Sequence, residues 1–176
     1  AGDAGNININ ARDTVTFDGI GTNNFFSSAN TVASSNAVGN GGNININTKK
    51  LFITNGGLLN TLSFGQGNAG NVFINANDSI ILDGIDNDGI PGGIQTFTSN
   101  NGDAGEIQLT TGLLSVANGA RLSTFTTGQG DAGNITINAR EQIIFDGVGS
   151  NNRSSGAFST VESSGVGNAG DIELTT

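Results

Sequence analysis

The side chains available for chemistry in this 176-residue sequence are carboxylates, amides and hydroxyls, because it contains no His and no Cys. The usual zinc, haem and iron–sulfur sites, thiol nucleophiles and serine triads that use His are therefore excluded. The net charge of −9, with only six Lys and Arg residues, argues against nucleic acids and anionic membranes as partners. No apolar run is long enough to span a bilayer. What remains is binding of hard cations and acid–base chemistry by carboxylates.

The densest cluster of carboxylates consists of Asp83, Asp86 and Asp88, followed directly by Gly89. Hard oxygen ligands on a short loop suit Ca²⁺, and the spacing resembles part of an Asp-x-Asn-x-Asp-Gly calcium loop. The bidentate acid that completes such a loop is missing, and the corresponding segments elsewhere in the chain lack the cluster. We name the three aspartates as candidate Ca²⁺ ligands, with turn formation by Asp and Gly as the alternative.

Two other sets of carboxylates recur along the chain. They are candidates for a glycoside-cleaving site, because such a site uses a pair of carboxyl groups. The sets are Asp13, Asp78 and Glu141, and Asp18, Asp83 and Asp146. If the repeats stack, members of one set stand about 9–10 Å apart, because they occur in alternate units. That distance is marginal for an inverting enzyme, which needs about 6.5–9.5 Å. Every carboxylate also occupies a repeat position, whereas a catalytic site breaks a repeat locally, so we assign no catalytic residue and expect no enzyme activity.

These side chains are positioned by a repeat, G-[DN]-[AG]-G followed by a polar residue and an apolar–x–apolar pair, which occurs six times. The second glycines of the motif are Gly5, Gly42, Gly70, Gly105, Gly133 and Gly170. Their separations are 37, 28, 35, 28 and 37 residues, so long and short units alternate. None of the glycine clusters precedes Lys-Ser/Thr or opens a helix, which excludes a phosphate-binding loop. We expect them to form the corner between one unit and the next.

Each unit carries three short apolar strips, the first with the strict alternation of a half-buried strand. In the unit that starts at Gly39, the strips are Ile44/Ile46, Leu51/Ile53 and Leu59/Leu62. The second strip ends in Asp-Gly in long units and in Asn-Gly in short units, and these dipeptides form turns because they tolerate positive φ. The apolar pair of the third strip is three residues apart, which predicts a bend or bulge in that strip.

Three short strands per unit, in about five units, predict an all-β parallel β-helix, or β-solenoid, with one domain over residues 1–176. Each strand would pair with its counterpart in the next unit, so that apolar residues and amides both stack in columns. A meander or sandwich is the alternative, but its strands would not need the alternation of 28 and 35–37 residues. One expected polar ladder follows the first strip and consists of Asn10, Asn47, Asn75, Thr110, Asn138 and Thr175.

The long units have their additional residues between the second and third strips. These segments are Ile20–Ser28, Ile85–Gly93 and Val148–Gly156. Because they alternate with short turns, we expect them to project as a row of loops along one edge of the solenoid. Such loops are the first place to look for specific binding. The alternative is that they are insertions tolerated at a corner.

A column of threonines falls at matching positions in all five units, and its members are Thr31, Thr61, Thr96, Thr124 and Thr160. Regular Thr arrays occur on ice-binding solenoids, so ice binding is a third functional alternative. Only one such column is regular here, with Phe or Val beside it, and a flat two-column array is not supported. We expect a hydroxyl ladder inside the third strand instead.

The units from Gly130 to Gly170 and from Gly67 to Gly84 carry the recurring G-[DN]-A-G-N-I-x-I-N-A element, with Val72 in place of the first Ile in the second of them, and resemble the repeats of filamentous-haemagglutinin-like exoproteins. The resemblance is greatest to the large, repeat-rich exoproteins of cyanobacteria and covers essentially the whole chain. It implies secretion by the two-partner pathway, a right-handed parallel β-helix, and a role as an exposed adhesin or fibre. It transfers no catalytic residue. No secretion domain is evident, so the chain is expected to be a piece of the central repeat array.

The function expected from the sequence is a structural and adhesive repeat segment of a secreted or cell-surface filamentous protein, without catalysis. The expected partners are further copies of the chain, end to end or in a continuing array, and surface glycans or extracellular matrix. The alternative is a carbohydrate-binding or carbohydrate-active β-helix of the polysaccharide lyase or hydrolase kind. Its site would appear as clustered charged residues that break the repeat. The expected location is extracellular.

Overall fold

The computed structural model describes residues 2–19, 26–85, 91–150 and 152–176, and every regular element in these ranges is a β-strand. The strands are β1 (Ile7–Asn10), β2 (Thr14–Asp18), β3 (Ser28–Ala33), β4 (Ile44–Thr54), β5 (Leu58–Ser63), β6 (Val72–Asp83), β7 (Gly93–Thr98), β8 (Ile107–Ala117), β9 (Arg121–Thr126), β10 (Ile135–Asp146), β11 (Gly156–Val161) and β12 (Ile172–Thr175). Within the same ranges there is no helix of the length and apolarity that a membrane crossing requires.

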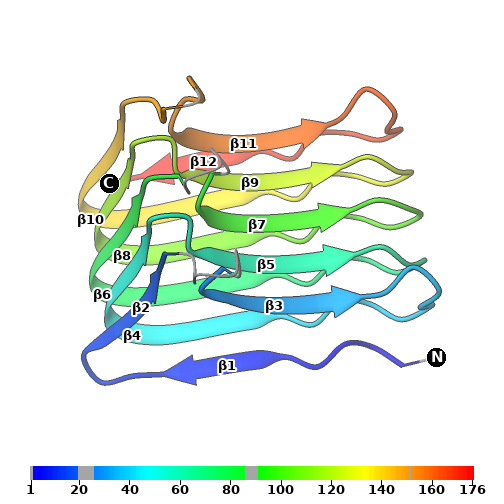
Figure 1. The fold of residues 1–176 in the computed structure, drawn as a ribbon, viewed down its shortest axis with the longest axis horizontal. Helices are drawn as coiled ribbons and strands as arrows, with labels where there is room; N and C mark the ends of the chain where they lie inside the picture. Colours follow the sequence, from blue (N-terminus) through cyan, green and yellow to red (C-terminus); the bar gives the residue numbers. More distant parts are fainter. Residues whose placement is uncertain (1, 20–25, 86–90, 151) are drawn as a thin grey trace.

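The strands form two parallel sheets that stack coil upon coil (Figure 1). The larger sheet has the order β1-β4-β6-β8-β10-β12, with β2 also paired to β4, and the smaller has the order β11-β9-β7-β5-β3. Each strand pairs with its counterpart one repeat further on, for example Ile44 with Val72 and Thr61 with Thr96. This register confirms the parallel β-solenoid. We refer to residues 2–38, 39–66, 67–101, 102–129 and 130–166 as coils 1 to 5.

The first two apolar strips join into a single bent strand in coils 2 to 5, and only coil 1 keeps three separate strands. The bend is marked by register shifts between Thr48 and Lys50, between Ala76 and Ser79, and between Ala139 and Gln142. The bulge expected in the third strip was wrong, because β3, β5, β7, β9 and β11 pair without any shift. The three-residue spacing there has a different cause: Leu59 points inward and Leu62 outward.

Length differences between the coils occur in three places rather than in the loops alone. The loops 19–27, 84–92 and 147–155 do alternate with the short turns 55–57 and 118–120. In addition, β6 and β10 have 12 residues, whereas β4 and β8 have 11. Coils 1 and 5 also have an extra turn after the third strip, closed by hydrogen bonds from Ala37 N to Ser34 O and from Gly165 N to Glu162 O.

The core is a set of aliphatic columns between the two sheets. Its fully buried side chains are Ile44, Ile46, Leu51, Ile53, Leu59, Ile80, Leu82, Ile94, Ile107, Leu109, Leu114 and Leu122. Residues in register across the larger sheet are similar in type, as in the column Ile44, Val72, Ile107 and Ile135. Because each full burial of such a side chain contributes roughly 1.5–3 kcal/mol, the stacked columns supply the main driving force for folding. Central coils bury these side chains more completely than coil 1, where Ile7 and Ile9 are only partly covered.

Candidate functional site

The repeat glycines form a corner at which backbone lies directly on backbone. A Cβ built on Gly42, Gly70, Gly105 or Gly133 would collide with the carbonyl of the equivalent glycine one coil earlier. None of these four needs a left-handed φ, so close approach alone requires glycine. In Figure 1 the turns after β3, β5, β7, β9 and β11, which contain this corner, lie one above another at the right of the molecule. We call this stacked region the glycine corner.

The Asp or Asn of the repeat motif forms a ladder along the glycine corner. Its side chain accepts a hydrogen bond from the backbone N–H of the equivalent residue in the next coil. The bonds run from Asn40 N to Asp3 Oδ1 (2.7 Å), Asn68 N to Asn40 Oδ1 (3.0 Å), Asp103 N to Asn68 Oδ1 (2.9 Å), Asp131 N to Asp103 Oδ1 (2.9 Å) and Asn168 N to Asp131 Oδ1 (2.7 Å). Asp and Asn both offer an acceptor Oδ1 at the same place, which explains why the motif accepts either.

A second ladder of the same kind is formed by the polar residue that follows the motif. Asn43 N donates to Asn6 Oδ1, Asn71 N to Asn43 Oδ1, and Glu106 N to Asn71 Oδ1, each at 2.8 Å. The ladder expected after the first strip is in register throughout, and a hydrogen bond of 3.1 Å joins Asn47 Nδ2 to Asn10 Oδ1. These amides therefore fasten coil to coil, which is a structural use of the side chains that dominate the composition.

The threonine column lies inside the solenoid and is also tied to the glycine corner. Thr31, Thr61, Thr96 and Thr124 are 0–3% exposed. Their hydroxyls donate to the carbonyls of Gly42, Gly70, Gly105 and Gly133 respectively. The expected hydroxyl ladder inside the third strand is confirmed for these four, and their burial means that they form no exposed array for ice.

The fifth position of the column was assigned wrongly. Ser159, not Thr160, pairs in register with Thr124. Its hydroxyl donates to Gly133 O at 3.0 Å and accepts from Gly170 N at 2.7 Å. Thr160 pairs with Phe125 and points to the outer face. The sequence alignment placed the wrong residue because Ser and Thr both carry the hydroxyl that the position requires.

The carboxylates that end the second strip hold the turn of the next coil. Asn55 Nδ2 donates to Asp18 Oδ1 at 2.8 Å, and Asn118 Nδ2 donates to Asp83 Oδ1 at 2.7 Å. Asn55 and Asn118 have φ values of 51° and 52°, so their turns adopt the left-handed conformation predicted for Asn-Gly. Hydrogen bonds from Thr54 and Asn55 lower the pKa of Asp18 below its ordinary value of 3.8. An Asp-Gly turn in one coil is therefore matched to an Asn-Gly turn in the next.

The calcium prediction is only partly within reach of the structure. Asp83 is placed, with Asn118 as its hydrogen-bond partner, whereas Asp86 and Asp88 lie outside the described residues. Elsewhere, the described part of the chain has no group of three or more Asp or Glu placed to hold a metal ion. Ca²⁺ therefore stays a prediction, which thermal melting tests: if Ca²⁺ is bound, adding a chelator lowers the melting temperature. An unchanged temperature would count against the site.

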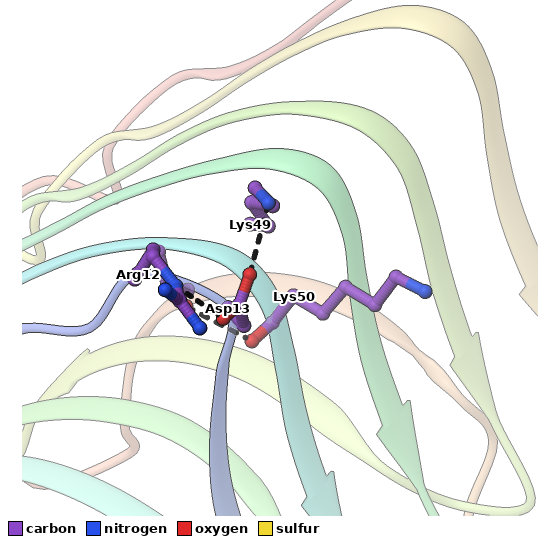
Figure 2. A network of polar contacts seen from close by, with 5 residues as sticks. Arg12, Asp13, Lys49 and Lys50 are labelled. Atoms are coloured by element: carbon purple, nitrogen blue, oxygen red, sulfur yellow. Dashed lines mark hydrogen bonds and ion pairs between the residues drawn. The ribbon is translucent and has the colours of Figure 1, made fainter.

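Asp13, one of the three carboxylates before the second strip, is engaged in surface contacts. Asp13 lies between Arg12 Nε at 2.6 Å and Lys49 Nζ at 2.9 Å, while the side chain of Lys50 extends away from it (Figure 2). The contacts from Lys49 and Arg12 lower the pKa of Asp13, and Asp13 in turn raises the pKa of Lys49. Because all three side chains are at least half exposed, this network contributes little to stability.

The described surface has one hollow that breaks the repeat, on the outer face of the smaller sheet over β7, β9 and β11. Its volume is about 420 Å³, which is within the range of about 300–1,000 Å³ typical of small-ligand sites. Arg121 lines it and pairs in register with Gly93 on one side and Gly156 on the other. The hollow exists because these two neighbours have no side chains. We call it the Arg121 hollow.

Side chains of several kinds line the Arg121 hollow. Polar groups come from Gln95, Ser123 and Thr160, aromatic rings from Phe125 and Phe158, and charges from Arg121, Arg153 and Glu162. Pro91, Gly92 and Arg153 belong to two of the long loops, so the hollow lies beside the loop row that the sequence indicated. Those two loops are closed in the same way, by antiparallel bridges between Ile85 and Pro91 and between Val148 and Ser154.

Arg121 is held in a defined position within the hollow. Its guanidinium lies 4.5 Å from the centre of the Phe158 ring, and its Nε donates to Ser154 O at 3.2 Å. The Phe158 ring fits over Gly156, where a Cβ would meet it. The pKa of Arg121 is lowered mainly by its partial burial and to a smaller extent by the nearby positive charge of Arg153. Arg121 nevertheless stays protonated at neutral pH. No sequence motif marks Arg121, although an alignment of the third strips shows a lone Arg between two glycines.

Comparison with known proteins yields no match to a family model, to a curated protein or to a solved structure. The function is therefore inferred from the two regions described above. One is the glycine corner with its ladders, which repeats in every coil. The other is the Arg121 hollow, which has no counterpart in register among the described residues of the other coils.

Proposed function

We propose that this chain is a structural and adhesive repeat segment of a secreted or cell-surface filamentous protein. The observation that supports it most is the repetition of the same fastening in every coil: stacked glycines, amide ladders and a buried hydroxyl column. In such an array each coil contacts only its neighbours, so length can be added without a new core. That property suits a rod that carries binding surfaces away from a cell.

The ends of the two sheets support continuation of the rod. β1 and β12 are the outermost strands of the larger sheet, and β3 and β11 are those of the smaller sheet. Such edge strands present backbone N–H and C=O groups that pair readily with another strand. We therefore propose that the partner at each end is a further coil, either of the same array or of a second copy. An extracellular location belongs to the same proposal.

The proposal includes no catalysis. Three of the six carboxylates that the sequence offers for a glycoside-cleaving site have structural partners: Asp13 is bound by Arg12 and Lys49, Asp18 by Asn55, and Asp83 by Asn118. The test is incubation of the protein with acidic and neutral polysaccharides, followed by measurement of new reducing ends and of unsaturated products. We expect neither, and sustained release of either product would replace the adhesive function by the carbohydrate-active alternative.

Electron microscopy of the native material tests the filament directly. We expect unbranched rods, with a repeat along the axis of about 4.8 Å, the spacing between paired strands. Discrete globular particles would contradict the proposal. Analytical sedimentation of the purified segment supplements the microscopy. If the strand edges associate, the fraction of oligomers should increase with protein concentration.

A further inference from the structure

Two of the six basic residues of this acidic chain line the Arg121 hollow. The sequence has 15 acidic and six basic residues. Among the described residues that line the hollow, two are basic (Arg121 and Arg153) and one is acidic (Glu162). The other basic side chains lie elsewhere, including the cluster of Arg12, Lys49 and Lys50 at the bend of the larger sheet (Figure 2). The hollow is thus a place where an anion is favoured over the surrounding surface.

Arg121 has donors left for a ligand. Its Nε is occupied by Ser154 O, and one face of its guanidinium lies on Phe158. Within the described part of the chain, its terminal amino groups make no other hydrogen bond. These two groups form the fork that binds a carboxylate with two parallel hydrogen bonds. Stacking on the ring fixes the guanidinium, so little freedom is lost when the ligand binds.

The rest of the hollow is suited to a sugar ring. Gln95, Ser123 and Thr160 offer an amide and two hydroxyls that can exchange hydrogen bonds with sugar hydroxyls. The partly exposed rings of Phe125 and Phe158 offer apolar surface against which the C–H face of a sugar can pack. An extended peptide that binds as an added strand needs a free strand edge. Under the hollow, β7 and β9 are already paired on both sides, and the free edge of β11 is on the side away from β9.

We propose that the Arg121 hollow binds an acidic polysaccharide through the carboxylate of a uronic acid residue. Arg121 holds the carboxylate, Phe125 and Phe158 support the ring, and the polar side chains of β7, β9 and β11 select the hydroxyls. The inference rests on the proposed adhesive function, to which it adds a site and a class of ligand. Because the hollow depends on one Arg between two glycines, it occurs once in these five coils.

The test is isothermal titration calorimetry of the full chain with a galacturonic acid hexamer as the probe. Two controls separate the parts of the ligand: a neutral glucose hexamer has the rings without the charge, and a glutamate hexamer has the charge without the rings. We expect the galacturonate hexamer to bind at least about tenfold more tightly than either control. Its affinity should fall with added salt, because part of the binding free energy comes from a charge pair. Equal binding of either control, or absence of binding, would overturn the assignment.

Variants place the binding in the hollow. Arg121→Gln should weaken galacturonate binding by about 10- to 100-fold, the range expected for loss of hydrogen bonds to a charged group. Arg12→Gln removes the same charge from an exposed position outside the hollow and should leave affinity unchanged. Arg121→Lys keeps the charge but lacks the forked pair of donors, so it should give an intermediate loss of affinity. Phe158→Leu should also weaken binding of the galacturonate hexamer. Circular dichroism confirms folding of each variant.

The outcomes for Arg121 and for the filament are separable. If Arg121→Gln and Arg12→Gln have equal effects, the hollow is not the site, although rods seen by microscopy would still support the structural function. If Arg121→Gln does not fold, the comparison of Arg121→Lys with Arg12→Gln decides in the same way. If the native particle is globular but binding still depends on Arg121, the proposed binding site stands and the proposed filament is wrong.

Discussion

The glycine corner and the Arg121 hollow lie on the same coils but differ in how they use the repeat. At the corner, every coil makes the same contacts, such as those of Asn68 and Asp103 with the coils before and after them. At the hollow, successive coils place Gly93, Arg121 and Gly156 at one register position. The corner therefore shows what holds the solenoid together, and the hollow shows where a coil differs from its neighbours enough to recognise something else.

This difference is expressed in tolerance to substitution. The corner has no room for an additional atom, because a Cβ on most of its glycines would meet backbone carbonyls that cannot move independently. The hollow is bordered by solvent and by side chains of which most, including those of Arg121, Phe125 and Phe158, are only partly buried. We therefore expect substitutions at the corner to change the free energy of unfolding and substitutions at the hollow to change binding. The predictions below test this separation, in order of decreasing effect.

The largest effect is expected from Gly105→Ala. Its Cβ would collide with the carbonyl of Gly70, so coils 3 and 4 would have to separate locally, at a cost of about 3 kcal/mol or more. Gly5→Ala is the matched control, because Gly5 has the same motif position at the end of the stack and open space around it. Urea denaturation followed by circular dichroism measures both. Similar destabilisation by the two would show that the stacking of glycines is not what the corner requires.

A smaller effect is expected from Thr96→Val, which keeps the shape of the side chain and removes the hydroxyl. The carbonyl of Gly105 loses a buried donor at 2.6 Å, and the free energy of unfolding should fall by about 1–2 kcal/mol. Thr16→Val makes the same chemical change at an exposed strand position and should be close to neutral. The same denaturation curves test it, and a neutral Thr96→Val would disconnect the hydroxyl column from the corner.

The amide ladder should contribute about 1 kcal/mol at each position. Asn71→Ala leaves the N–H of Glu106 without its side-chain acceptor. Asn8→Ala is the control, since Asn8 bonds only the exposed side chain of Asn45 in the next coil. Thermal melting of the two variants compares them. If Asn8→Ala lowered the melting temperature as much as Asn71→Ala, the stabilisation would come from surface amides in general and not from the side-chain-to-backbone ladder.

The smallest effect concerns pH and the exposed carboxylates. The pKa values of Asp13 and Asp18 are lowered from 3.8 in the folded chain, so their contribution to stability is present above that pH. It is lost as the pH falls through the lowered values, because the unfolded chain takes up protons first. Asp13→Asn should therefore flatten the acid side of the stability curve slightly. If the stability of Asp13→Asn fell with pH below 4 as steeply as that of the unsubstituted chain, Asp13 would not contribute to the pH dependence of stability.

Much of the fold could be predicted because the repeat reports the register directly. The glycine spacing aligned Gly70 with Gly105, and the alternation in Ile44/Ile46 marked the inward face. The bulge was misplaced because the spacing of Leu59 and Leu62 has two explanations, a bulge or residues on opposite faces. The sequence does not distinguish them, since the outer face of the smaller sheet is itself apolar at Leu62, Phe97 and Phe125.

The candidate site was less predictable, for a physical reason. Pattern reasoning finds residues that recur, whereas the hollow depends on Arg121, which does not recur, and on the missing side chains of Gly93 and Gly156. The cation–π contact with Phe158 joins two adjacent coils and shows only when the third strips are aligned in the correct register. The loop row did indicate the right edge, because Pro91 and Arg153 belong to loops and line the hollow.

Residue-resolved amide hydrogen exchange of the folded chain tests the central claim, that the glycine corner fastens the stack more firmly than the long loops do. At the corner, the N–H groups of Ala69 and Ala104 bond the carbonyls of Asp103 and Asp131. At the loop edge, Gly149 N bonds Arg153 O within its own loop. We predict slow exchange for Ala69 and Ala104, close to the rate set by global unfolding, and fast exchange for Gly149. Corner amides that exchange as fast as Gly149 would contradict the account.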